Sequence, residues 1–144
     1  MSAYFHRVVY YETDQMGIVH HSNYIRWFEE ARDAYVREHG IDYRRIEANG
    51  ILMPVTDLKC DYKSAAKYWD LAAITVCVLS FNGVRLRYGY EVRNAETGAL
   101  VVTGETGHCF IDAGTRRPLI LKKYMPDYAG ILLELLAQKD GDRA

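Results

Sequence analysis

The sequence predicts a single-domain α+β protein, with a five-stranded antiparallel sheet, one long helix and a short C-terminal helix. Three observations lead to this fold class. The 144 residues fit one domain, 1–144, and no repeat or Pro/Gly-rich linker divides them. Only one segment in the first half has a long helical period. The segments that follow it alternate between apolar and polar residues, as half-buried strands do.

The chain opens with a strand and continues into the long helix. Residues 4–11 are rich in β-branched and aromatic side chains, which predicts a strand, and the polar segment 12–17 predicts a loop. From Tyr24 onward, apolar residues recur every three or four positions, as they do on one face of a helix. This stripe consists of Tyr24, Trp27, Phe28, Ala31 and Tyr35. Gly40 stands where a glycine commonly ends a helix.

A loop is expected as far as Gly50, and strand patterns then dominate. Residues 57–62 alternate in polarity, and the nearly continuous apolar stretch 71–81 predicts a strand inside the sheet. Asn82-Gly83 predicts a hairpin turn of type I′, in which both residues adopt a positive φ.

Two further strands and a helix complete the predicted order. Residues 84–93 and 99–112 are both typical of strands. Gly104 and Gly107 interrupt the second pattern, which indicates a bulge or a close approach of another group to the backbone. Asp127 is placed to cap a short amphipathic helix near the C-terminus.

The composition is that of a globular protein, with 49% hydrophobic and 26% charged residues. Lys and Arg number 18 against 19 Asp and Glu, so no basic field favours nucleic acid. No apolar run reaches the roughly 20 residues of a membrane span, and the start lacks a secretory pattern. Cys60, Cys77 and Cys109 are too widely spaced and too few for a disulfide framework. We therefore expect a cytoplasmic protein that binds neither nucleic acid nor membrane.

One long helix cannot cover both faces of a five-stranded sheet. One face or one edge of the sheet is then left to bury against a partner. On this ground alone we expect a homo-oligomer.

Several kinds of chemistry find no support. Motifs for nucleotide phosphates, dinucleotides, a serine nucleophile and a zinc protease are absent. His20 and His21 lie near acidic residues, but adjacent histidines point apart and no further ligand follows, which argues against a metal. His108 is expected to be a core or interface histidine. Arg85 and Arg87 share a strand face, which predicts either a solvated surface or an anchor for an anionic ligand.

The segment from Tyr11 to Tyr24 reads YETDQMGIVHHSNY and could act on an acyl carbonyl. It leads into the first turn of the long helix, where unpaired backbone N–H groups could stabilise an oxyanion. Asp14 could serve there as nucleophile or general base, and Gly17 would let the loop fold back. An equally supported interpretation is that Asp14 only caps its loop through an Asx-turn.

This segment resembles the signature of the 4-hydroxybenzoyl-CoA thioesterase family of hot-dog proteins. The family pattern has an aromatic residue and an acid, then Thr-Asp, a glycine, two aliphatic residues, and aromatic or His positions. The sequence supplies Tyr11, Glu12, Thr13, Asp14, Gly17, Ile18, Val19, His20, His21, Asn23 and Tyr24. The predicted order of elements is also that of a hot-dog fold, in which the sheet wraps around the long helix. Residues 116–128 are similar to the family's closing segment.

The resemblance implies an acyl-CoA thioesterase in which Asp14 is the catalytic carboxylate, either as nucleophile or as the base that activates water. It further implies that the backbone N–H of His21 polarises the thioester carbonyl, and that Gly17 holds the loop against the acyl group. The residues implied to bind substrate are Thr13, His20, Tyr24, Lys63, Ser64, Arg85 and Arg87. The last four would hold the nucleotide end of coenzyme A. No metal or other cofactor is implied.

The resemblance also implies homodimers that enclose two sites and pair into a homotetramer. The sequence departs from the family pattern at Glu12, where Asp is frequent, and at His20, where an aromatic residue is frequent. Both residues are expected close to the acyl group. Activity is expected to require Asp14 in its charged form.

Two other functions compete with hydrolysis. A non-catalytic acyl-CoA binding or sensor protein could have the same fold, although it would gain nothing from an acid beside the thioester. A hot-dog hydratase would need an acid facing the site from the long helix, and Glu29, Glu30 and Asp33 lie mostly on the polar face. The acyl group (short, long or aromatic) and the thiol that carries it stay open.

Overall fold

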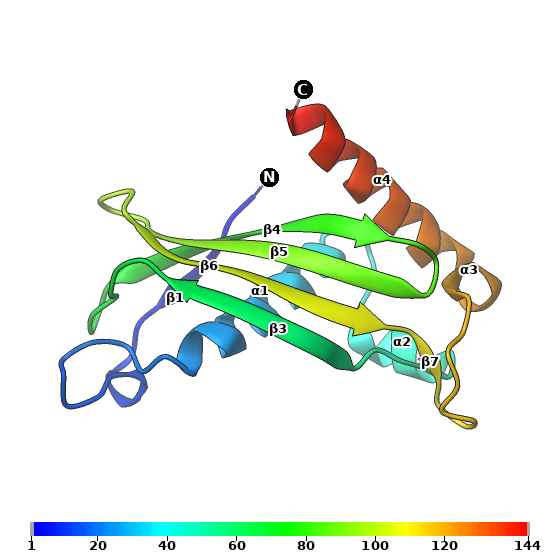
Figure 1. Ribbon diagram of the computed structural model, residues 1–144, viewed down its shortest axis with the longest axis horizontal. Coiled ribbons are helices and arrows are strands. Elements are labelled where there is room, and N and C mark those ends of the chain that lie inside the picture. The colour runs from blue at the N-terminus through cyan, green and yellow to red at the C-terminus, as the bar shows by residue number, and fades with distance from the viewer. Residues whose placement is uncertain (1, 144) are drawn as a thin grey trace. The chain divides into compact units, whose positions relative to one another are not determined.

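A computed structural model describes residues 2–143 of the protein, with side chains described for residues 2–138. Its main sheet consists of β1 (Tyr4–Arg7), β3 (Val55–Tyr62), β4 (Leu71–Phe81), β5 (Arg85–Asn94) and β6 (Leu100–Cys109). Figure 1 shows these strands, which follow the order β1-β4-β5-β6-β3. β1 runs antiparallel to β4, with Tyr4 opposite Ile74. A two-stranded sheet pairs β2 (Ile51–Leu52) with β7 (Ile111–Asp112).

The long predicted helix is α1 (Asn23–Arg37), preceded by one 3-10 turn, η1 (Tyr10–Glu12). The other helices within residues 2–143 are α2 (Tyr43–Ala48), α3 (Leu121–Tyr124) and α4 (Pro126–Arg143). Asp127, expected to cap the C-terminal helix, lies instead within its first turn, because the helix begins at Pro126; proline fits the first helical position without losing a hydrogen bond. The five-stranded sheet and its long helix confirm the predicted α+β hot-dog architecture.

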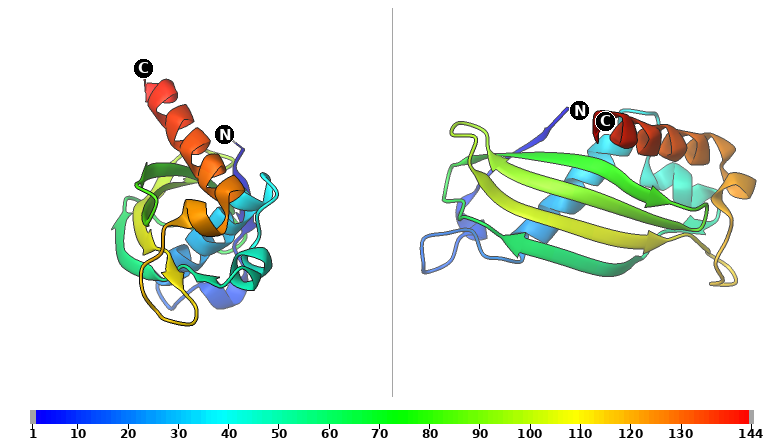
Figure 2. Two further views of the ribbon diagram at one scale, coloured as in Figure 1. Left: turned by 90° about the vertical axis from the view of Figure 1, so that its right-hand side faces the viewer. Right: turned by 45° about the horizontal axis from the view of Figure 1, so that its top comes forward.

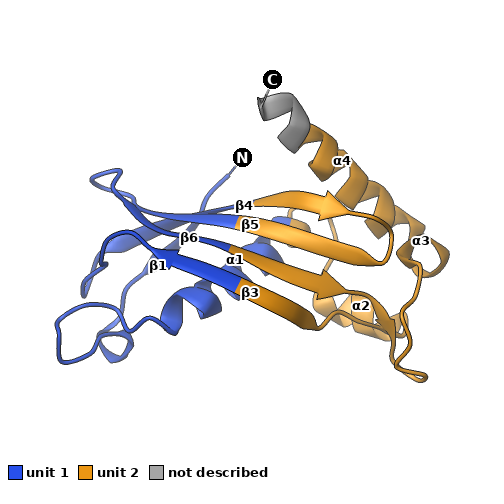
Figure 3. Ribbon diagram, viewed as in Figure 1, with its two compact units in different colours: residues 1–35, 59–76, 90–104 blue, residues 36–58, 77–89, 105–144 orange. Residues whose placement is uncertain are grey.

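The chain divides into two compact units, which Figure 3 shows in different colours. Unit 1 consists of residues 1–35, 59–76 and 90–104. Unit 2 consists of residues 36–58, 77–89 and 105–144. Unit 1 therefore holds β1, η1 and most of α1, and unit 2 holds α2, α3, α4 and the two-stranded sheet. That residues 1–144 form one domain stays a prediction.

In unit 1 the apolar stripe of α1 packs on β5 and β6. Phe28 is fully buried and stacks on Tyr90, with ring centroids 4.3 Å apart. A Cβ atom at Gly104 would lie 2.5 Å from the Phe28 ring, closer than real contacts allow. The close approach predicted at Gly104 is thus confirmed, because only a residue without a side chain leaves room for this ring.

In unit 2 the turn between β4 and β5 anchors the segment that leads into α3 and α4, the orange and red helices of Figure 2. The N–H of Leu121 donates to the carbonyl of Gly83, and that of Phe110 to the carbonyl of Val84. The buried ring of Phe110 also meets Tyr128 of α4 edge to face, at 5.8 Å between centroids. An aromatic cluster therefore joins the end of β6 to α4.

The structure corrects two strand boundaries. The strand expected over 4–11 ends at Arg7, because the Glu12 side chain accepts a hydrogen bond from the N–H of Val9 and holds residues 10–12 in a 3-10 turn. The strand expected over 99–112 is interrupted at Phe110, whose ring turns into the core. Its last two residues pair instead with β2.

Two turn regions also differ from expectation. The expected loop before Gly50 contains α2, which is capped by Asp42 accepting a hydrogen bond from the N–H of Arg45. The prediction of a type I′ turn at Asn82-Gly83 is wrong, because only Gly83 of these two residues has a positive φ. Asn82 shapes the turn with its side chain, whose Oδ1 accepts the N–H groups of Val84 and Arg85.

Candidate active site at the start of the long helix

The loop between η1 and α1 is closed like a small hairpin. Thr13 and Val19 form an antiparallel bridge, and the N–H of Asp14 donates to the carbonyl of Ile18 at 3.0 Å. Between them, the N–H of Gly17 donates back to the carbonyl of Asp14. Gly17 has a φ of 77°, a conformation that side chains other than hydrogen disfavour. The glycine predicted to let the loop fold back therefore does so.

The Asp14 carboxylate is half-buried, and only one of its two oxygens accepts a hydrogen bond from the described residues. Its Oδ1 accepts the N–H of Met16 at 2.8 Å, which is the Asx-turn that the sequence left open. Its Oδ2 receives no hydrogen bond or ion pair from the side chains described, those of residues 2–138, or from the described backbone. The two interpretations of Asp14 are thus compatible, because one oxygen shapes the loop while the other is available to a substrate or a water molecule.

The entrance of α1 carries an available backbone donor. The N–H of Asn23 donates to the carbonyl of His20, and the N–H of Ser22 to the His20 ring. The N–H of His21, the residue after His20, donates no hydrogen bond to any described residue. The rings of His20 and His21 are exposed and lie 4.1 Å apart, so the expectation that these adjacent side chains point apart is wrong. A free N–H at a helix N-terminus can stabilise negative charge that develops on a carbonyl oxygen.

Tyr62, at the end of β3, contacts this entrance and was missed from the sequence. Its hydroxyl donates to the carbonyl of His21 at 3.0 Å, and its ring lies 5.7 Å from that of Tyr24. Burial, together with Cys60, raises the pKa of Tyr62 to about 12, so its hydroxyl keeps its proton at neutral pH. The alternation of residues 57–62 was the available signal, since it places Tyr62 on the same strand face as Cys60.

The residues just after β3 belong to the same unit. The hydroxyl of buried Tyr24 accepts the N–H of Ala66, which holds the β3–β4 connection against α1. Lys63 and Ser64 both donate their N–H groups to the carbonyl of Val101, and the Ser64 hydroxyl donates to Leu100. The side chain of Lys63 is exposed and makes no ion pair with the described residues. Unit 1 therefore contains every predicted site residue except Arg85 and Arg87.

Glu12, which is expected close to the acyl group, points into the interior with 4% of its surface exposed. Its carboxylate accepts hydrogen bonds from the N–H of Val9 and the indole N–H of Trp27, and it lies 2.8 Å from His6 Nε2. Burial would raise the pKa of this carboxyl, but the hydrogen bonds from Val9, His6 and Trp27 outweigh that effect and lower it. The buried charge of Glu12 is therefore stabilised by three partners inside unit 1.

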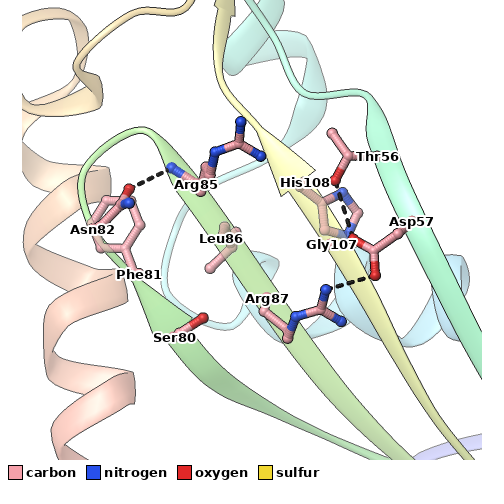
Figure 4. Close-up of a pocket in the computed structure, with 10 residues that line it drawn as sticks. All are labelled: Thr56, Asp57, Ser80, Phe81, Asn82, Arg85, Leu86, Arg87, Gly107 and His108. Carbon is pink, nitrogen blue, oxygen red and sulfur yellow. Dashed lines mark hydrogen bonds and ion pairs between the residues drawn. The ribbon is translucent and has the colours of Figure 1, made fainter.

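Arg85 and Arg87 lie in unit 2 and line a cavity of about 280 Å³, shown in Figure 4. The Arg87 guanidinium forms ion pairs with Asp57 at 2.6 Å and with Glu105 at 3.4 Å. The hydrogen bond from Arg87 lowers the pKa of Asp57. Arg85 is exposed, and its guanidinium makes no ion pair in the described part of unit 2. Of the two predicted anion anchors, Arg85 is thus the one whose charge is not already neutralised.

The remaining candidates have structural surroundings. His108 is buried, with its Nε2 2.8 Å from the Thr106 hydroxyl and its ring packed edge to face on Tyr88, as expected of a core histidine. The three cysteines are half-buried, and none forms a disulfide among the described residues. In the part of the chain that is described, no three His, Cys, Asp or Glu side chains come close enough together to hold a metal ion. No helix there is long and apolar enough to cross a membrane.

The hot-dog sheet, with an acidic loop leading into the long helix, defines a thioester hydrolase of the hot-dog class. The chain belongs to the thioesterase-like superfamily, whose family model matches residues 8–128. The resemblance first carried by the motif around Asp14 therefore extends over most of the chain.

Individual relatives agree with this assignment. The Bacillus subtilis (strain 168) protein YneP is 36% identical over 121 residues, which are 84% of this chain and 87% of YneP. The acyl-CoA thioester hydrolase YbgC of Escherichia coli O6:H1 is 29% identical over 94 residues, 65% of this chain and 70% of YbgC. The structure of a DHNA-CoA thioesterase from Staphylococcus aureus superimposes with a TM-score of 0.92 at 35% identity, covering 98% of this chain and 94% of that chain.

Proposed function

We propose that this protein hydrolyses acyl-CoA thioesters to a free acid and coenzyme A, with Asp14 as the catalytic carboxylate. The observation that carries the proposal is the pairing of two available groups in one closed loop. Asp14 has a free carboxylate oxygen, and the N–H of His21 is a free donor at the start of α1 within the described chain. The bridge between Thr13 and Val19 ties the two ends of that loop together. An acyl carbonyl between these groups would meet an acid and an oxyanion donor.

The reaction can proceed in two ways from this arrangement. As a nucleophile, Asp14 adds to the thioester carbon, the coenzyme A thiolate leaves, and water then hydrolyses the resulting anhydride. As a general base, Asp14 takes a proton from water, whose oxygen adds to the same carbon before the thiolate leaves. In both, the N–H of His21 stabilises the oxyanion. Both need Asp14 charged, and neither uses a metal or redox cofactor.

The substrate's two ends are assigned by the chemistry of the side chains. We propose that Lys63 and Ser64 in unit 1, and separately Arg85 in unit 2, are anchors for phosphate groups of coenzyme A. Arg87 is a weaker candidate, because Asp57 and Glu105 already neutralise its charge. For the acyl group we propose an aromatic acid as the first class to test. The rings of Tyr24, Tyr62 and His21 surround the entrance of α1, and the S. aureus relative is named for a naphthoate-type thioester.

The assembly is proposed from the exposed edge of the sheet. β3 is the last strand of the sheet, and Val55, Leu58 and Tyr62 along it are 48%, 40% and 48% exposed. An unpaired edge with apolar side chains favours pairing with another strand. We propose that two chains pair along β3 as a homodimer, that dimers associate into a homotetramer, and that the enzyme acts in the cytoplasm. Leu58→Asp should shift the mass in light scattering toward the monomer, whereas Leu133→Asp, at a leucine of α4 that is even more exposed, should not.

The test of the activity compares Asp14→Asn with wild type on a panel of short, long and aromatic acyl-CoAs. The asparagine Oδ1 can still accept the N–H of Met16, so the loop should keep its shape. Loss of the carboxylate should lower kcat by at least about 100-fold. The matched control is Asp42→Asn at the N-cap of α2. Its asparagine can likewise still accept a backbone N–H, that of Arg45, but the residue lies outside the proposed active site.

Each outcome decides between the proposed functions. Turnover by wild type and Asp42→Asn but not by Asp14→Asn supports hydrolysis by Asp14, and the best substrate identifies the acyl class. If wild type binds acyl-CoA without turnover of any member, the protein is the non-catalytic binding or sensor protein instead. Equal turnover by Asp14→Asn would overturn the assignment of the catalytic residue.

A further inference from the structure

The buried residue Glu12 is held by hydrogen bonds from three separate segments. His6 comes from β1, Val9 precedes η1, and Trp27 is fully buried in α1. Oε1 accepts the Val9 N–H at 2.9 Å and Oε2 accepts the Trp27 indole N–H at 2.7 Å. His6 Nε2 lies 2.8 and 3.0 Å from the two oxygens. Because an ionised carboxylate only accepts, Nε2 of His6 is the donor in this contact, and Nδ1 of the same ring lies 3.3 Å from Oε2 of Glu30.

The main chain of Glu12 holds the other end of the loop. Its carbonyl oxygen accepts the N–H of His20 and the side-chain Nδ2 of Asn23, both at 2.8 Å. Asn23 is the first residue of α1, and its side chain is buried. The carbonyl of Glu12 therefore contacts the residues on both sides of His21, the proposed oxyanion donor.

Through these contacts Glu12 connects the loop that carries Asp14 to the residues around His21, the two proposed reacting groups. Asp14 follows Glu12 by two residues, and His21 follows directly after His20. The side chain of Glu12 fixes the loop to α1 through Trp27, while its carbonyl fixes the helix entrance. A shift of Glu12 would therefore change the distance between the Asp14 carboxylate and the N–H of His21.

A carboxylate is required here, rather than any polar group of the same shape. Both oxygens of Glu12 accept a hydrogen bond from an N–H group that cannot reverse its direction: the amide of Val9 and the indole of Trp27. A glutamine would place its NH₂ group against one of these two donors. One buried donor would then be left without an acceptor, and the loop would have to move to relieve the contact.

We propose that Glu12 is a positioning residue for the hydrolytic reaction: it sets Asp14 relative to the start of α1 without contacting the substrate itself. The inference rests on the proposed function of Asp14 and goes beyond it by assigning a role to a buried acid outside the reacting groups. It explains why a charged side chain occupies the interior of unit 1, immediately before the catalytic loop. A positioning residue changes the rate of the chemical step more than it changes binding.

The experiment measures kcat and KM for wild type, Glu12→Gln, Glu12→Asp, Asp14→Asn and Phe28→Leu on the best acyl-CoA of the panel. Glu12→Gln should lower kcat on the order of 10- to 100-fold and leave KM within about threefold. Phe28→Leu is the control for stability, because Phe28 lies on α1, as Trp27 does, and its loss opens a cavity against Tyr90 of β5. Its kcat should stay within about twofold even where its Tm falls as far as that of Glu12→Gln.

The pH profile of kcat separates positioning from direct catalysis. In Glu12→Gln the profile should keep its acidic limb and be scaled down as a whole, because the proposed reacting carboxylate of Asp14 is still present. Loss of that limb would mean that Glu12 is itself the base, which overturns the proposal. Partial recovery of kcat in Glu12→Asp, which keeps the charge, supports it.

The remaining outcomes distinguish this proposal from the proposed function. If Asp14→Asn is inactive and Glu12→Gln turns over like wild type, Glu12 has no positioning role and Asp14 keeps its own. If Asp14→Asn is as active as wild type, the catalytic assignment itself fails, and with it the role given to Glu12. A kcat loss in Phe28→Leu equal to that in Glu12→Gln would show a merely structural role.

Discussion

The hydroxyl of Tyr62 donates a hydrogen bond of 3.0 Å to the main-chain carbonyl of His21. This bond joins the end of β3 to the entrance of α1, two elements separated by 41 positions in the chain. Its acceptor belongs to the same residue whose N–H is the proposed oxyanion donor. The orientation of that backbone unit therefore depends on the edge strand of the sheet as well as on the loop around Asp14.

Replacing Tyr62 with Phe should lower kcat several-fold, because the peptide unit at His21 loses its fixed orientation. The pKa of Tyr62, raised to about 12 by burial and by Cys60, supplies a second readout. In an ultraviolet titration, the difference between wild type and Tyr62→Phe should show one tyrosine that ionises far above the ordinary value of 10.0. A difference spectrum that appears at pH 10 would contradict this environment for Tyr62.

The contact between Gly104 and Phe28 makes a prediction about stability. Gly104→Ala should lower the free energy of unfolding by about 1–3 kcal/mol, because its Cβ would overlap the buried ring. Gly130→Ala, in α4, has nothing within 4 Å and should instead raise it by about 0.5–1 kcal/mol. Urea unfolding of both variants provides the measurement, and a loss of stability in Gly130→Ala would show a contact that the structure does not contain.

The pKa of Glu12 is lower in the folded protein than its ordinary value of 4.5, which links stability to pH. The contribution of such a group is fully present above the unfolded pKa and is lost as the pH falls through the folded pKa. Wild type should therefore lose stability below about pH 4.5 more steeply than Glu12→Gln does. Urea midpoints measured from pH 3 to pH 7 would reveal the difference, and parallel curves would refute the linkage.

The two arginines of the unit 2 cavity should behave differently. Arg85→Ala should raise KM for acyl-CoA by about tenfold, because a phosphate of the substrate loses the guanidinium that binds it. The same variant should keep a Tm close to that of wild type. Arg87→Ala should mainly lower the Tm, because Asp57 and Glu105 lose their partner and lie near each other. Free coenzyme A as a competitive inhibitor is the matching measurement. An unchanged inhibition constant in Arg85→Ala would remove this residue from the nucleotide's binding site.

Periodicity alone predicted the elements whose pattern is long and regular. The stripe of α1 and the strand over 71–81 depend on side chains that repeat at the period of their own element, so the chain displays them locally. The loop around Asp14 was also predictable, because Gly17 and the acidic motif lie close together in the sequence. The short helix α2 was not predicted from the sequence. Its one local signal is Asp42, which caps the helix three residues before Arg45, and a single cap is too weak to predict a helix without the neighbouring strand β2.

The fold class, the order of the main elements and the position of the acidic loop before the long helix could all be predicted from local sequence patterns. Each of these depends on residues within a few positions of one another. The roles of Glu12, Tyr62 and Arg87 became visible only in the folded chain, because their partners Trp27, His21 and Asp57 lie 15, 41 and 30 positions away. A carboxylate or guanidinium looks the same in a sequence whether it is free or neutralised, because the free energy of a charge is set by groups that folding brings to it.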